Sequence, residues 1–221
     1  MIMYNEKGRR TVKMKDRKLF IWDFDGTLLD TYPFITMCLK NALKDCGYEV
    51  AQMEILEKMM VTIPFAIGHY SDKYQIPDLR ERYYAYYAGE AEAPVRAFTG
   101  LKEVLRRIQE IGAANYVFTN RGNSIYPLLE KAGILGEFRE IVTAEDPNFM
   151  VKPAPDTINY LMKKYGGTSE NTVMIGDRYC DLESGYNAGC RTCHLLTPAV
   201  PQYPPCDWRV KNFEEMLKLL K

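Results

Sequence analysis

At residues 19–28 the chain reads Leu-Phe-Ile-Trp-Asp-Phe-Asp-Gly-Thr-Leu, so that an apolar run leads directly into two aspartates and a glycine. A short apolar run of this kind is typical of a strand buried in a parallel sheet. Asp23 and Asp25 are two positions apart, and in extended backbone they project to the same side. Two carboxylates this close repel each other unless a cation neutralises them, and Mg²⁺ prefers oxygen ligands. The segment therefore predicts a strand that ends in an acidic site suited to a divalent ion.

Strands and helices alternate along the chain from residue 98 onward. Short apolar runs predict strands at 116–118, 141–142, 173–175 and 192–196. Apolar residues at helical spacing predict helices at 101–111, 123–132, 155–165 and 181–188, and from Asn212 onward. Single helices between successive strands are typical of a parallel sheet. The predicted fold class is α/β, a doubly wound parallel sheet of the Rossmann-like type.

Residues 32–97 interrupt this alternation. Their patterns predict helices at 34–46, 51–60, 65–74 and 79–91, separated by Pro64, Pro77 and Pro94. An all-helical block of this size between the first strand and the next unit is expected to form a smaller inserted domain. The predicted organisation is a flexible basic leader at 1–17, an α/β core at 18–31 and 98–221, and a helical domain at 32–97.

Polar side chains also follow the later strands, where open parallel sheets place their binding sites. Thr119 and Asn120 offer a hydroxyl group and amides to a phosphate. Lys152 precedes a predicted helix, and its ammonium can offset the charge of a phosphoryl group. Asp177 ends another strand within reach of the metal, and Asp181 can hold the ion or orient its ligands. Together these residues predict a phosphate and metal site.

The four segments resemble the four sequence motifs of the haloacid dehalogenase-like hydrolases. The matching segments are 23–31, 119–120, 152–156 and 176–181. The similarity runs from about Leu19 to Leu196, and 185–189 resembles a turn of the branch that contains phosphoglycolate phosphatases and β-phosphoglucomutases. The helical insert resembles the cap domain of that branch, which implies a cap that closes over the substrate.

The resemblance implies a catalytic role for each polar residue. Asp23 would be the nucleophile that becomes an aspartyl-phosphate, and Asp25 would be first the general acid and then the general base. Thr119 and the Asn120 amide would bind the phosphate. Lys152 would steady both Asp23 and the transferring group. Such a nucleophile divides one difficult displacement into two easier steps.

The resemblance also implies Mg²⁺ as the cofactor. Its ligands would be the Asp23 side chain, the Asp25 main-chain carbonyl and Asp177, while Asp181 would support the ion or Lys152. Arg121, directly after the phosphate-binding pair, is a candidate for binding a second anionic group of the substrate.

The implied activity is that of a Mg²⁺-dependent phosphatase acting on a small phosphorylated metabolite. The dehalogenases that give the family its name lack the second aspartate, so the presence of Asp25 argues against dehalogenation. One alternative is a phosphomutase of the β-phosphoglucomutase type, although Thr27 stands where mutases often carry valine. Another is a non-catalytic protein of this fold that binds phosphate or a protein partner.

Charge and hydropathy limit the partners. Lys plus Arg equals Asp plus Glu at 29 each, so no overall field favours nucleic acid or an anionic membrane. No apolar run approaches the roughly 18 residues of a membrane span, and no secretory signal follows the basic start. The 6 cysteines are then expected to be reduced thiols. We expect a cytoplasmic monomer or homodimer that binds neither nucleic acid nor membrane.

One cysteine motif has two interpretations. Residues 190–194 read Cys-Arg-Thr-Cys-His, the pattern of covalent haem attachment, and with Cys206 they would offer four zinc ligands. The same residues also read as a buried strand. The strand interpretation is favoured because no exported context for haem attachment is present.

Overall fold

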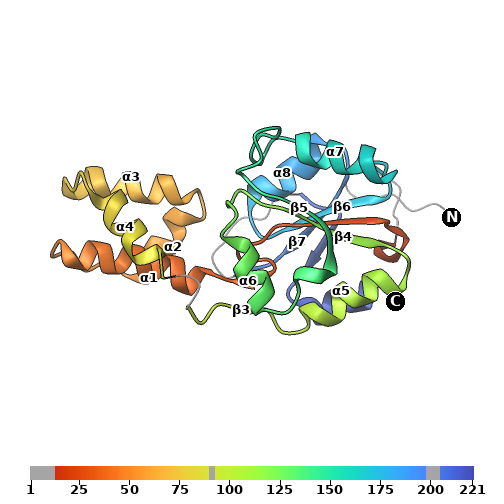
Figure 1. Cartoon of the computed structure of the whole chain (residues 1–221), viewed down its shortest axis with the longest axis horizontal. Coiled ribbons are helices and arrows are strands. Elements are labelled where there is room, and N and C mark those ends of the chain that lie inside the picture. The colour runs from red at the N-terminus through yellow and green to blue at the C-terminus, as the bar shows by residue number, and fades with distance from the viewer. Residues whose placement is uncertain (1–12, 90–92, 198–204) are drawn as a thin grey trace. The chain divides into compact units, whose positions relative to one another are not determined.

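The computed structural model describes residues 13–89, 93–197 and 205–221. The described residues divide into two units. One contains 13–28, 97–197 and 205–221, and the other contains 29–89 and 93–96. Figure 1 shows a sheet flanked by helices in the first unit and a group of helices in the second.

The first unit is built on a sheet of six parallel strands in the order β5-β4-β1-β6-β7-β8. The strands are β1 (Leu19–Trp22), β4 (Ala114–Phe118), β5 (Phe138–Val142), β6 (Thr172–Gly176), β7 (Arg191–Leu195) and β8 (Trp208–Val210). All four residues of β1 are buried, because this strand lies between β4 and β6 and is covered on both faces. Its position explains the uninterrupted apolar run in the sequence.

Helices follow the strands of the first unit. They are α5 (Leu101–Glu110), α6 (Ile125–Lys131), α7 (Asp156–Tyr165), α8 (Tyr179–Asn187) and α9 (Phe213–Leu219). In Figure 1, α7 and α8 lie on one side of the sheet and α5 lies on the other. The predicted α/β fold class is therefore confirmed, although β8 was not predicted.

Local signals fix the ends of several helices. Gly166 ends α7 with a φ of 67°, a conformation that glycine adopts without steric cost. Asn212 caps α9, since its side-chain oxygen accepts a hydrogen bond of 2.9 Å from the Glu215 amide. In return, the Glu215 carboxylate accepts from the Lys211 amide at 2.8 Å. These contacts agree with the predicted start of this helix.

The start of the described chain differs from the predicted flexible leader. Residues Met14–Asp16 form a short 3₁₀ helix, and both Met14 and Arg17 are buried. Lys15 donates a hydrogen bond of 2.5 Å to the main-chain oxygen of Lys221. Residues 13–17 thus pack as part of the first unit because an apolar side chain anchors them, whereas residues 1–12 lie outside the described residues.

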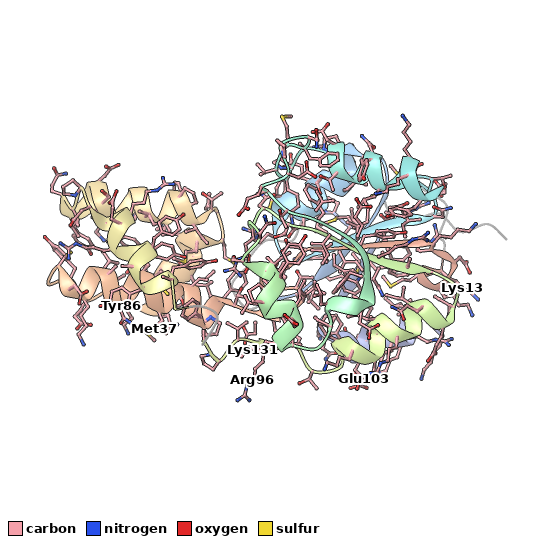
Figure 2. The ribbon with its side chains drawn as sticks, viewed as in Figure 1. Lys13, Met37, Tyr86, Arg96, Glu103 and Lys131 are labelled. Atoms are coloured by element: carbon pink, nitrogen blue, oxygen red, sulfur yellow. The ribbon has the colours of Figure 1, made fainter. Side chains whose placement is uncertain are left out.

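The second unit consists mainly of α1 (Tyr32–Asp45), α2 (Gln52–Met59), α3 (Ile63–Tyr74) and α4 (Leu79–Tyr87). Its core includes the fully buried side chains of Leu39, Tyr70 and Tyr83. The predicted helix at 79–91 ends early, at Tyr87, and its last two positions lie outside the described residues. Met37 and Tyr86 project from the surface of this unit (Figure 2).

Pro64 lies inside the first turn of α3 and does not precede the helix as predicted. A proline is tolerated there because the first amides of a helix have no partner within it. The Thr62 hydroxyl oxygen caps the same turn by accepting from the Phe65 amide at 3.0 Å.

Two short strands, β2 (Leu29–Asp30) and β3 (Arg96–Ala97), pair where the chain passes between the units. None of the helices in the described part of the chain combines the length and hydropathy needed to cross a bilayer.

Candidate active site

Three candidate residues follow neighbouring strands of the sheet. Asp23 follows β1, Thr119 follows β4 and Asp177 follows β6. Trp22, the last residue of β1, is level with Val117 in β4 and Ile175 in β6. Because the three strands are parallel and in register, these side chains emerge at the same edge of the sheet.

Lys152 lies at the centre of the site. Its ammonium donates hydrogen bonds to Asp23 Oδ1 and, at 2.6 Å, to Asp181 Oδ1. All three side chains are fully buried. The loop that follows β5 therefore brings a cation to aspartates that follow β1 and β6.

The side chain of Asn120 fixes the backbone of Lys152. Asn120 Nδ2 donates to the Lys152 main-chain oxygen at 3.1 Å, and the Lys152 amide donates to Asn120 Oδ1 at 2.7 Å. The Lys152–Pro153 peptide bond is cis. The sequence predicted the Asn120 amide as a phosphate ligand, and this stays a prediction; the structure adds that the Asn120 side chain bonds the Lys152 backbone.

Asp23, Asp177 and Asp181 offer carboxylate oxygens that lie within 4.8 Å of one another. Over residues 13–89, 93–197 and 205–221 this is the only group of three or more acidic, histidine or cysteine side chains close enough to share a metal ion. Asp23 Oδ2 is buried and has no hydrogen-bond partner among these residues. An orphaned buried carboxylate oxygen beside two further carboxylates fits a hard divalent cation.

The three aspartates differ in how their oxygens are used. Asp181 Oδ1 accepts from Lys152, and its Oδ2 accepts from the Arg178 amide at 2.9 Å. Asp177 Oδ1 accepts from the Thr27 hydroxyl at 3.2 Å. Both oxygens of Asp181 are thus already engaged by nitrogen donors, so Asp23 and Asp177 are better suited as side-chain ligands.

Burial and the neighbouring charges shift the pKa values of the side chains in the site. Burial and the neighbouring Asp181 charge raise the pKa of Asp23 to about 6, against the opposing effect of Lys152. Burial alone would lower the pKa of Lys152, but Asp181 and Asp23 outweigh it and raise this pKa above its ordinary value. The pKa of Asp181 is lowered, because Lys152 and Arg178 overcome the effect of burial. Two carboxylates share one ammonium, and an added cation would favour ionised Asp23.

Gly176 is required for close packing at the end of β6. A Cβ atom at this position would lie 2.3 Å from the Asp181 Cβ and 2.5 Å from one of its carboxylate oxygens. Any side chain here would displace Asp181 from Lys152. The sequence interpretation included Gly176 and Thr27 in its motif segments without giving either a role in the site; their contacts with Asp181 and Asp177 supply one.

Asp25 lies outside the group of three aspartates. Its Oδ1 accepts from Arg121 Nη1 at 2.9 Å, and the two side chains are 15% and 6% exposed. The Arg121 guanidinium also lies over the Phe24 ring, 5.4 Å from its centroid. The Arg121 amide donates to Thr119 Oγ1 at 3.1 Å. Arg121, predicted to bind substrate, thus contacts the carboxylate predicted to be the general acid and base.

The Cys-x-x-Cys-His segment forms most of β7, as the strand interpretation expected. Cys190, Cys193 and His194 are buried, and successive strand residues such as Cys193 and His194 point to opposite faces. His194 Nε2 forms a hydrogen bond of 2.9 Å with the Asp177 main-chain oxygen. This histidine therefore supports the loop that carries Asp177.

The part of the chain that carries this site is similar to known proteins. Residues 20–195 match the family model described as haloacid dehalogenase-like hydrolase. A phosphoglycolate phosphatase from Aliivibrio fischeri is 26% identical over 193 residues, which cover 82% of this chain and 85% of that protein.

Two solved structures share the fold. One, from Haemophilus somnus 129pt and described as a predicted phosphoglycolate phosphatase, has a TM-score of 0.80 at 23% identity and covers 93% of this chain and 99% of its own. The other, YfnB from Bacillus subtilis, is described as a putative HAD-hydrolase bound to magnesium; it has a TM-score of 0.72 at 22% identity and covers 92% of this chain and 98% of its own.

Proposed function

The chain belongs to the haloacid dehalogenase-like hydrolases and is an enzyme of the phosphatase type, and we propose that it hydrolyses a small phosphorylated metabolite through an aspartyl-phosphate on Asp23. This proposal depends on the contacts of the two Asp23 carboxylate oxygens. One of its oxygens is held by Lys152, and the other, Oδ2, is buried with no hydrogen-bond partner among the described residues. Lys152 fixes the carboxylate, and no described residue occupies Oδ2, so this group is open to the substrate and to a divalent ion beside it, as nucleophilic attack requires.

In the first step an oxygen of Asp23 attacks the phosphorus atom of the substrate. The bond between phosphorus and the ester oxygen breaks, and that oxygen takes the proton of the Asp25 carboxyl group. The products are the free alcohol, an aspartyl-phosphate and the Asp25 carboxylate. Lys152 offsets the negative charge on the phosphoryl oxygens, which is the main requirement of phosphoryl transfer.

In the second step the Asp25 carboxylate takes a proton from a water molecule as its oxygen attacks the phosphorus. The bond between phosphorus and Asp23 breaks, which releases inorganic phosphate and regenerates the Asp23 carboxylate and the Asp25 carboxyl group. The Thr119 hydroxyl oxygen accepts from the Arg121 amide, so its own proton is directed elsewhere and is suited to a phosphoryl oxygen.

Mg²⁺ fits the oxygen donors of this site, with Asp23, Asp177 and the Asp25 main-chain carbonyl as its proposed ligands. When bound, a divalent ion supplies positive charge that stabilises the phosphoryl oxygens in the transition state. Asp181 keeps Lys152 in place and is proposed to act through it. The magnesium bound to the Bacillus subtilis relative supports the choice of ion.

Phosphoglycolate is the first substrate to test, because the Aliivibrio fischeri relative is a phosphoglycolate phosphatase. At 26% identity this name supports the class of substrate, a small phosphate monoester, more than the individual compound. A panel of phosphorylated metabolites ranked by kcat/KM would identify the preferred substrate.

The test is phosphate release from 4-nitrophenyl phosphate and from phosphoglycolate, with Mg²⁺ and with a chelator. We expect turnover with Mg²⁺, its loss on chelation and no turnover by Asp23→Asn. Equal release by Asp23→Asn and the wild-type protein would overturn the proposal. A hexose 1-phosphate assayed for hexose 6-phosphate would reveal a mutase in place of a phosphatase.

A further inference from the structure

We propose that Arg121 is a positioning residue for Asp25, holding the carboxyl group of the general acid and base at the reacting oxygen. This inference rests on the proposed function and assigns a role to the Arg121 side chain, which the two-step mechanism does not otherwise use. Its starting point is the ion pair of 2.9 Å between Arg121 Nη1 and Asp25 Oδ1.

The ion pair is largely, though not completely, removed from water. The Arg121 side chain is 6% exposed and that of Asp25 is 15% exposed. An exposed ion pair contributes little, but removing one partner of a mostly buried pair leaves the other charge poorly compensated. The relative position of the Arg121 and Asp25 side chains is therefore fixed more firmly than in an exposed ion pair between two long side chains.

Arg121 is itself anchored at three points. Its amide donates to Thr119 Oγ1 at 3.1 Å, its main-chain oxygen accepts from the Ala144 amide at 2.9 Å, and its guanidinium lies over the Phe24 ring. These contacts tie the loop after β4 to the loop after β1 and to the segment after β5. The guanidinium consequently has little freedom to move away from Asp25.

This arrangement gives the Arg121 side chain a role beyond substrate binding. The N–H group that donates to Asp25 is committed to that carboxylate and cannot be donated to a substrate anion at the same time. Asp25 must present its carboxyl group to the ester oxygen and then to water, and a misplacement of about 1 Å can cost about 100-fold in rate. Arg121 holds one oxygen of that carboxyl group, which fixes the orientation of the group and the position of its other oxygen.

The experiment compares Arg121→Gln, Arg121→Lys, Asp25→Asn and the double variant Arg121→Gln/Asp25→Asn. Arg107→Gln is the matched control, because Arg107 forms an ion pair with Glu110 within α5, a helix of the same unit that carries no proposed site residue. Folding is checked by circular dichroism and thermal unfolding. Arg121→Lys keeps the charge and gives a second folded variant to measure if Arg121→Gln fails to fold.

The expected result separates positioning from substrate binding. Arg121→Gln lowers kcat about 10- to 100-fold with KM changed less than about twofold, which is the signature of an interaction used in the transition state. Arg121→Lys restores part of the loss. In the Asp25→Asn background, removing Arg121 lowers kcat by less than about threefold further, because the residue acts through Asp25.

The leaving group gives a readout that a purely structural role would not change. An alkyl alcohol needs a proton as it leaves, whereas the 4-nitrophenyl group leaves as the 4-nitrophenolate anion without one. We expect Arg121→Gln to lower kcat/KM about 10-fold more for phosphoglycolate than for 4-nitrophenyl phosphate, since kcat/KM covers the steps up to release of the alcohol.

Opposite outcomes would overturn the inference. A raised KM with unchanged kcat would return Arg121 to substrate binding, and equal losses with both substrates would reduce it to a structural residue. In either case the proposed function stands as long as wild-type turnover depends on Asp23. A wild-type protein without turnover on either substrate would instead contradict the proposed function and this inference with it.

Discussion

Lys152 and Asp181 form a fully buried ion pair of 2.6 Å, and the same ammonium also bonds the carboxylate of Asp23. Two negative charges and one positive charge are thereby held inside the protein at the end of the sheet. Buried charges of this kind are costly unless they are paired and hydrogen-bonded. The burial of these three charged groups implies a catalytic purpose. Removal of any one of them should disturb the other two.

Replacing the central cation should therefore both destabilise the protein and abolish turnover. Lys152→Met leaves two carboxylates buried without their cation, and we expect the free energy of unfolding to fall by about 3–5 kcal/mol. Lys164→Met is the control, because Lys164 pairs with Glu140 while 44% exposed and should cost about 1 kcal/mol or less. Urea unfolding of the two variants checks this, and similar losses for both would contradict it.

The contact between Gly176 and Asp181 predicts a second sensitive position. The added methyl group of Gly176→Ala would overlap Asp181, so we expect a loss of about 1–3 kcal/mol in stability and at least about a 10-fold loss of kcat. Gly136→Ala is the control, since nothing lies within 4 Å of a Cβ atom there. Normal turnover by Gly176→Ala would show that Asp181 does not need its present place.

The aspartate group predicts that Mg²⁺ stabilises the folded protein. A ligand that binds only the folded state at 100 times its Kd adds about 2.7 kcal/mol. We expect thermal unfolding of the wild-type protein to shift upward with Mg²⁺ and to return with a chelator. Asp177→Asn should lose this shift, whereas Asp78→Asn, on the exposed Asp78–Arg82 pair, should keep it. An equal shift in Asp177→Asn would place the ion elsewhere.

Glu140 predicts a defined loss of stability in acid. Burial would raise the pKa of Glu140, but hydrogen bonds from Tyr165, Lys164 and Tyr160 outweigh it and hold the pKa below its ordinary value of 4.5. The folded state therefore favours the carboxylate, and this contribution is full well above pH 4.5 and is lost as the pH falls below it.

Glu140→Gln should remove that contribution. The difference in free energy of unfolding between wild type and Glu140→Gln should shrink as the pH is lowered from about 6 to about 3, measured by urea unfolding at each pH. A difference that stays constant over this range would show that the charge of Glu140 contributes nothing.

Much of the fold could be predicted because its strands are buried and parallel. The run at Leu19–Trp22 is apolar throughout, since both faces of β1 are covered, and the turn residues after it are chemically distinctive. Strand β8 could not be predicted in this way. Trp208 is partly exposed, Arg209 is exposed and only Val210 is buried, so this edge strand lacks a clear pattern.

The residues of the site were more predictable than their contacts. Thr119 and Asp177 follow strands, and parallel strands in register bring them to one edge. The pairing of Arg121 with Asp25, 96 positions apart, depends on the path of two loops that no periodicity encodes. The clamp of Asn120 on the Lys152 backbone depends on loop geometry in the same way.

The most direct test of the central claim is chemical trapping of the covalent intermediate. Protein quenched with acid during turnover is treated with borohydride, which reduces an aspartyl-phosphate to homoserine, and its peptides are sequenced by mass spectrometry. We expect homoserine at position 23 only when substrate is present, and none in Asp23→Asn. Homoserine at another aspartate during turnover, or equal homoserine at position 23 without substrate, would contradict it.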